Sequence, residues 1–151
     1  MSAARPRVFI TQPVAPRAIE RLEARAEVAW NPDPLHIMTK AELLHAVRDV
    51  DYLFCLLQDR IDFDVIAANP SLRMIASMMI IPADIDVAAA SARRIPVTVI
   101  PAMVTEATAD IAMALLLAVA RRVAEADRLV RAGTFPGAQS RYLEGHAVAG
   151  A

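Results

Sequence analysis

The chain has 151 residues, a formal net charge of −1 and one cysteine, and 56% of its residues are hydrophobic, which is typical of a globular domain. Average usage would give about 10 glycines. The chain has 4, all after residue 132, which excludes glycine-dependent phosphate cradles from most of its length. The balanced charge, without a basic stripe, argues against a nucleic-acid partner.

The lengths of the apolar runs and the single cysteine indicate where in the cell the protein is expected. The longest apolar run, residues 111–120, is about half of what spanning a bilayer requires. The apolar run near the amino terminus, residues 8–10, is too short for the core of a signal peptide. A single cysteine suits a reducing compartment. We therefore expect a cytoplasmic protein with no membrane segment.

Short β-type runs alternate with helical segments along the first hundred residues. Thr39 with Glu42 forms a capping box, and Asp62 and Asp86 are in position to cap two further helices. The apolar run at 52–57 is typical of a strand buried on both faces. Strands are expected at 7–10, 28–30, 52–57, 73–78 and 96–99, and helices at 16–26, 41–47, 63–69 and 87–93. This alternation predicts an α/β fold, with a parallel five-stranded sheet and helices on both faces.

One long helix is expected over residues 105–131, roughly 40 Å in length. Its middle, 111–120, is apolar all round, so every side of it needs cover. The simplest cover is the same helix of a second copy, and we expect a homo-oligomer through this helix. The predicted division is a domain at 1–104, the long helix at 105–132 and a tail at 133–151.

The candidate ligand site lies after the third and fourth strands, because open parallel sheets bind ligands at the carboxyl ends of their strands. Asp59 and Arg60 follow the third strand and Glu106 opens the long helix; these three are the candidate catalytic residues. The predicted substrate-binding residues are Gln58, Met78, Met79, Ile80, Ile81 and Asp84. The two methionines and two isoleucines would form an adaptable apolar wall.

Metal chemistry and thiol chemistry are not expected. His36, His45 and His146 form no pair with metal-ligand spacing, and there is no Cys-x₂-Cys motif. Cys55 lies inside a predicted strand, where burial raises a thiol pKa and leaves it inert.

Several segments resemble the NAD-dependent D-2-hydroxyacid dehydrogenases, in particular the glyoxylate and hydroxypyruvate reductase branch. The matching segments are 72–77, 84–87, 95–98 and, most specifically, 105–122. The resemblance implies a flavodoxin-like substrate domain, then a helix that crosses into a cofactor domain for NAD or NADP and helps form a dimer. The family's cofactor fingerprint and its catalytic Arg, Glu and His lie beyond the position of Gly145. We therefore expect no cofactor binding and no hydride transfer by this chain alone.

Three family glycines are replaced in this sequence. Ile81 and Pro82 stand in the loop with which the family cradles the substrate carboxylate, Arg94 stands in a turn and Ala102 in a following loop. A branched residue restricts the backbone and proline removes a donor, so the loop's binding chemistry is predicted to have changed.

Three functions are consistent with these features. The chain could supply the substrate domain to an enzyme completed by a separate cofactor-domain chain, with a small organic acid as ligand. It could be a repurposed, cofactor-independent protein or enzyme that binds an apolar small molecule. It could also be an oligomeric scaffold that interacts through helix 105–131.

Overall fold

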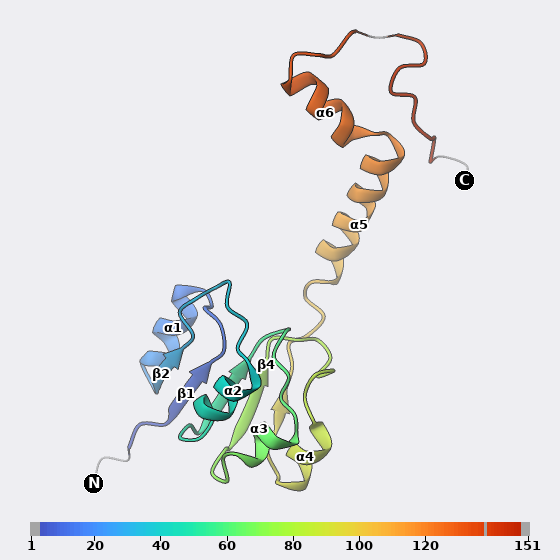
Figure 1. Cartoon of the computed structure of the whole chain (residues 1–151). Helices are drawn as coiled ribbons and strands as arrows, with labels where there is room; N and C mark the ends of the chain where they lie inside the picture. Colours follow the sequence, from blue (N-terminus) through green and yellow to red (C-terminus); the bar gives the residue numbers. More distant parts are fainter. Residues whose placement is uncertain (1–3, 138, 149–151) are drawn as a thin grey trace. The chain divides into compact units, whose positions relative to one another are not determined.

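The computed structural model describes residues 4–137 and 139–148 (Figure 1). The chain divides between Pro101 and Ala102 into two compact units, each of which is described by itself. The predicted domain boundaries stay a prediction.

The first unit is an all-parallel sheet of five strands in the order β2-β1-β3-β4-β5. Its strands are β1 (Arg7–Ile10), β2 (Glu27–Trp30), β3 (Tyr52–Cys55), β4 (Met74–Ser77) and β5 (Val97–Thr98), and its helices are α1 (Pro16–Glu23), α2 (Lys40–Ala46), α3 (Phe63–Ala67) and α4 (Val87–Ala92). The predicted flavodoxin-like α/β fold is confirmed.

Short polar side chains start three of these helices where the sequence indicated. The backbone N–H of Thr39 donates to Glu42 at 2.7 Å, and the Thr39 hydroxyl accepts from the N–H of Glu42, which completes the capping box of α2. Asp62 accepts from two backbone N–H groups at the start of α3, and Asp86 accepts from one at the start of α4. These bonds satisfy donors that a helix start leaves free.

The two faces of the sheet are covered unequally. Helices α2, α3 and α4 pack on one face, where Leu53, Cys55 and Ile75 are buried. On the other face α1 packs against β1 and β2, and Tyr52 and Phe54 of β3 remain only half-buried. The expectation that β3 is buried on both faces is therefore wrong, because no helix of the first unit covers this part of the sheet.

The second unit corrects the expectation of one helix over residues 105–131. It contains α5 (Thr105–Ala120) and α6 (Val123–Arg131), and Arg122 between them adopts a left-handed conformation with φ 53°. After α6 the chain returns to the junction between α5 and α6, where the N–H of His146 donates to the carbonyl of Ala120 at 2.8 Å. A Cβ at Gly145 would lie 2.4 Å from that carbonyl oxygen, so only glycine permits this approach.

None of the helices in the described ranges is long and apolar enough to cross a membrane.

Arg94 generates the first prediction, because it has a left-handed backbone (φ 58°) at the end of α4. Its N–H donates to Ser91 and that of Ile95 to Ala90, both at 2.9 Å, so the turn is held by its own hydrogen bonds. We expect Arg94→Gly to raise the free energy of unfolding by about 1 kcal/mol, since glycine adopts this conformation without the steric cost. Urea denaturation measures the change. Arg94→Ala is the control, and an equal gain from alanine would contradict the explanation.

Candidate functional site

The carboxyl ends of β1, β3 and β4 lie beside one another, and backbone hydrogen bonds join the loops that follow them. The N–H of Thr11 donates to Phe54 and that of Met78 to Cys55, both at 3.0 Å. Farther along the two loops, the backbone N–H of Ile61 donates to the carbonyl of Asp84 at 2.8 Å, and the carbonyl of Ile61 accepts from the N–H of Asp86 at 2.9 Å. Loops 56–62 and 78–86 are therefore adjacent, and the ligand site expected at these loops stays a prediction.

Asp59 is completely buried at this edge. One carboxylate oxygen, Oδ2, accepts from the hydroxyl of Thr11 and from the N–H of Leu56 at 2.7 Å. The other, Oδ1, has no hydrogen-bond partner among the residues described. This geometry supports a positioning role, in which Asp59 fastens loop 56–62 to the end of β1. Thr11, itself buried, was missed by the sequence analysis, although its place directly after a strand is the signal that indicated Asp59.

Most of the other predicted ligand contacts are exposed at this edge. They are Gln58, Arg60, Met78, Ile80, Ile81 and Asp84, whereas Met79 is buried in the core. Gln58 accepts a long hydrogen bond of 3.5 Å from Gln12. Within the part of the chain that the structure describes, Arg60 has no carboxylate oxygen within 4.0 Å. Arg60 is therefore available to pair with an anion.

Lys40, by contrast, is already engaged near this edge. Its Nζ donates to Asp62 at 2.8 Å and also to Asp64. The hydrogen bond from Lys40 lowers the pKa of Asp62, and the two carboxylates raise the pKa of Lys40. Arg60 is thus the better candidate for binding a ligand's carboxylate.

The backbone of loop 78–86 offers few donors to a ligand. The N–H of Ala83 donates to Ile81 at 2.9 Å and that of Ile85 to Pro82 at 3.3 Å, while Pro82 has no N–H. The N–H groups of Ile80 and Ile81 make no hydrogen bond to another described residue. No residue of this loop has a positive φ. The N–H of Asp84 likewise makes no hydrogen bond to another described residue, so an anion could bind through Ile80 and Ile81 or through Asp84.

Glu106 lies in the first turn of α5, in the second unit, and is exposed; its catalytic role stays a prediction. No group of three potential metal ligands occurs among residues 4–137 and 139–148. A dinucleotide does not fit the described residues either. Gly133, Gly137 and Gly145 all lie in the second unit, and no strand-to-helix turn of the sheet contains a glycine to approach a pyrophosphate.

Cys55 is buried beneath this edge, in β3. Burial, followed by the charge of Asp59, raises the pKa of its thiol to about 12. At neutral pH the side chain is therefore an uncharged core residue, as the sequence indicated.

Because of this pKa shift, the free energy of unfolding depends on pH in the alkaline range. The thiol ionises near 9.0 when unfolded but at about 12 when folded, so unfolding becomes easier as pH rises above 9. Above pH 9 we expect the free energy of unfolding of the wild-type protein to fall by up to about 1.4 kcal/mol per pH unit more than that of the Cys55→Ala variant. The variant lacks the thiol and therefore serves as the control. Urea denaturation of both proteins from pH 8 to 10 measures the difference. Parallel curves for the two proteins would contradict the shift.

A family model and two curated relatives match most of this chain. The family model described as D-isomer specific 2-hydroxyacid dehydrogenase, catalytic domain, matches residues 8–145. The chain is 45% identical over 129 residues to a glyoxylate reductase from Thermococcus kodakarensis, covering 85% of this chain and 38% of the relative. It is 44% identical over 133 residues to a glyoxylate reductase from Aeropyrum pernix, with the same coverage.

Solved structures agree with the sequence relatives. The TT0316 protein from Thermus thermophilus superimposes with a TM-score of 0.86 at 38% identity, covering 93% of this chain and 45% of that one. The NADPH-dependent glyoxylate/hydroxypyruvate reductase of Sinorhizobium meliloti, in complex with NADP and malonate, gives 0.66 at 30% identity, covering 87% and 39%. The chain thus spans less than half the length of these proteins.

Proposed function

Because the chain belongs to the D-isomer-specific 2-hydroxyacid dehydrogenase family, we propose that residues 1–151 supply the acid-binding part of a reductase for a small 2-oxo acid. The observation that carries this proposal is the family match over residues 8–145, which includes both loops of the carboxyl edge. Several relatives are named glyoxylate reductase, so glyoxylate is the first substrate to test.

The proposed binding chemistry uses groups that the fold leaves free. The Arg60 guanidinium forms charge-assisted hydrogen bonds to the acid's carboxylate, and the N–H groups of Ile80 and Ile81 contribute further donors. Asp59 does not touch the acid; through Thr11 and Leu56 it keeps loop 56–62 in place. Gln58 and Asp84 are exposed on the two loops and orient the rest of the ligand.

Reduction requires a nicotinamide cofactor, which supplies the hydride when bound. Since the residues of this chain do not fit a dinucleotide, we propose that the cofactor is held by polypeptide outside residues 1–151. This chain alone is then not competent for hydride transfer. A cytoplasmic location remains our expectation from the single cysteine.

Complementation tests this proposal. The chain alone, with NADH and glyoxylate, is expected to show no loss of absorbance from NADH. Mixed with a separately expressed cofactor half of the Thermococcus kodakarensis enzyme, it is expected to oxidise NADH. Arg60→Ala should lose most of this activity, because one guanidinium–carboxylate pair is removed, whereas Arg17→Ala on α1 is the matched control. A mixture in which the two halves bind each other but oxidise no NADH would contradict the proposal.

The apolar character of loop 78–86 favours a second candidate function. Met78, Ile80 and Ile81 are exposed by 43%, 40% and 70%, which is a contact surface suited to an aromatic or aliphatic acid larger than glyoxylate. In this alternative the protein binds such an acid without a cofactor.

One variant separates the two candidates. Ile81→Gly with Pro82→Ala removes a branched side chain and adds a backbone donor. If the loop binds a small 2-oxo acid, the Kd for glyoxylate should fall about tenfold, the value of one hydrogen bond to a charged group. If it binds an apolar acid, affinity for phenylacetate should fall instead. Calorimetric titration measures both, with Arg94→Gly as a control for glycine substitution away from the site. Unchanged affinity for both acids would contradict a ligand-binding role of the loop.

We also propose that the chain forms a homo-oligomer through residues 105–131. Helix α5 supports this, because its apolar side chains are exposed around the helix; Ile111, Leu116 and Leu117, which point to three different sides, are exposed by 57%, 47% and 46%. Apolar patches of this extent usually mark interaction surfaces.

A further inference from the structure

A parallel bridge between the two loops of the carboxyl edge determines which of their side chains are neighbours. Ile61 pairs with Ile85 in this bridge, and both isoleucines are buried. Side chains alternate between the two sides of an extended chain. Arg60 and Asp84, each one residue earlier, are exposed and therefore lie opposite each other on the solvent side. Paired strands are about 4.8 Å apart, so these two residues are direct neighbours across the loops.

Arg60 and Asp84 carry opposite charges, yet they do not form an ion pair with each other. No nitrogen of Arg60 lies within 4.0 Å of an oxygen of Asp84, and within the described ranges neither side chain has another partner of opposite charge at that distance. An exposed pair of this kind gains little from direct contact, because water screens both charges. Both charges are therefore available to a ligand that contacts them together.

The other carboxylates of this edge have partners, which distinguishes them from Asp84. Asp62 accepts from Lys40 and caps α3, Asp86 caps α4, and Asp59 is buried. The backbone N–H of Asp84 makes no hydrogen bond to another described residue, so it offers a donor beside the Arg60 guanidinium. One cation, one backbone donor and one carboxylate are thus exposed side by side.

A ligand that matches this arrangement has a carboxylate and, on the next carbon, a positively charged donor. We propose that Arg60 and Asp84 together bind the zwitterionic form of a small 2-amino acid. The ligand's carboxylate accepts from the Arg60 guanidinium and from the N–H of Asp84, and its ammonium group donates to the Asp84 carboxylate. A dicarboxylate is disfavoured, because its second carboxylate would lie against Asp84.

This inference rests on the proposed acid-binding function of the same edge and names a further chemical class of ligand for it. A 2-oxo acid and the 2-amino acid with the same carbon skeleton then compete for Arg60. Asp84 determines which of the two binds more tightly, since a carbonyl oxygen has no proton to donate to a carboxylate.

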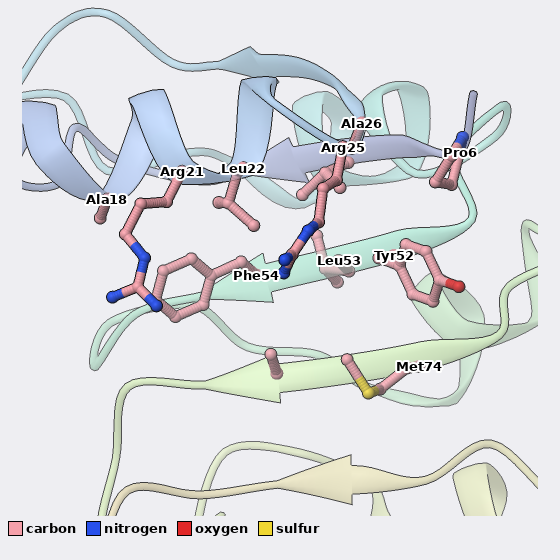
Figure 2. Close-up of a pocket in the computed structure, with 12 residues that line it drawn as sticks. Pro6, Ala18, Arg21, Leu22, Arg25, Ala26, Tyr52, Leu53, Phe54 and Met74 are labelled. Carbon is pink, nitrogen blue, oxygen red and sulfur yellow. The ribbon is translucent and has the colours of Figure 1, made fainter.

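The groove beside α1 shows that arginines alone do not provide this selectivity. Arg21 and Arg25 line the groove (Figure 2), and none of the residues that line it is acidic. An anion is attracted there whatever its second group is, because no carboxylate repels another anion or accepts from an ammonium group. Arg21 therefore provides a control for general attraction of anions.

Four three-carbon acids test the inference on the full chain. Next to the carboxylate, alanine has an ammonium group, lactate a hydroxyl and pyruvate a carbonyl oxygen, whereas malonate has a second carboxylate. NMR titration of the ¹⁵N-labelled protein measures each Kd from the amide signals of residues 60–62 and 80–85. We expect an enantiomer of alanine to bind about threefold or more tightly than pyruvate, and malonate to bind most weakly. Asp84→Asn should remove the preference for alanine, and Asp84→Lys should make malonate the tightest ligand.

Matched variants control for charge and for folding. Asp49→Asn removes an exposed aspartate that precedes β3, at the other end of the strand, and should change none of the four Kd values. Arg21→Ala should also leave them unchanged, whereas Arg60→Ala should weaken alanine and pyruvate alike. Circular dichroism checks that each variant is folded, which is expected because all of these side chains are exposed.

The outcomes separate this inference from the proposed function. Equal affinity for alanine and pyruvate in the wild-type protein would overturn the inference, as would a preference for alanine that survives in Asp84→Asn. If Arg60→Ala weakens pyruvate while the Asp84 variants change no affinity, the acid-binding proposal stands and only the inference fails. If none of the acids shifts a signal of residues 60–62 or 80–85, acid binding at this edge fails, and the inference fails with it.

Discussion

The carboxyl edge of the sheet depends on one buried carboxylate. Asp59 accepts hydrogen bonds from the hydroxyl of Thr11 and the N–H of Leu56, and these bonds join the end of β1 to the loop after β3. An enclosed carboxylate whose second oxygen lacks a partner among the described residues is costly to bury. Its presence indicates that the position of the loop matters enough to offset this cost. The bonds between Ile61 and the next loop then extend the fixed region to residue 86.

Each of the two units leaves an apolar surface exposed. The first unit leaves an apolar strip open beside α1, and the second unit contains a helix with apolar side chains exposed around it. Each surface on its own is unfavourable in water.

Much of the first unit was predictable because local signals agree with the fold. The capping box at Thr39 and the caps at Asp62 and Asp86 determine where helices start, and alternation of strands and helices determines the parallel topology. The burial of β3 was not predictable, because a continuous apolar run does not show whether a helix covers each face. The break at Arg122 was also hidden, since it depends on residues 144–146 returning to the end of α5.

That loops 56–62 and 78–86 lie side by side was predictable, but the surroundings of their individual residues were not. Position follows from topology, since strand ends in a parallel sheet converge on one edge. The role of each residue depends on whether the loop conformation buries or exposes its side chain. Asp59 and Arg60 are neighbours in the sequence, yet one is buried and the other exposed, and the hydrogen bonds that Asp59 accepts from Thr11 and Leu56 explain the difference.

The left-handed backbone of Arg94 distinguishes it from Ile81, the other position at which the sequence analysis predicted a replaced family glycine. At Arg94 the turn has a positive φ that neighbouring hydrogen bonds impose, so a side chain at this position costs conformational energy. At Ile81 the backbone has no positive φ, and the side chain is instead exposed at the candidate site. A side chain at Arg94 therefore affects the conformational energy of a turn, whereas the side chain at Ile81 affects the composition of an exposed surface.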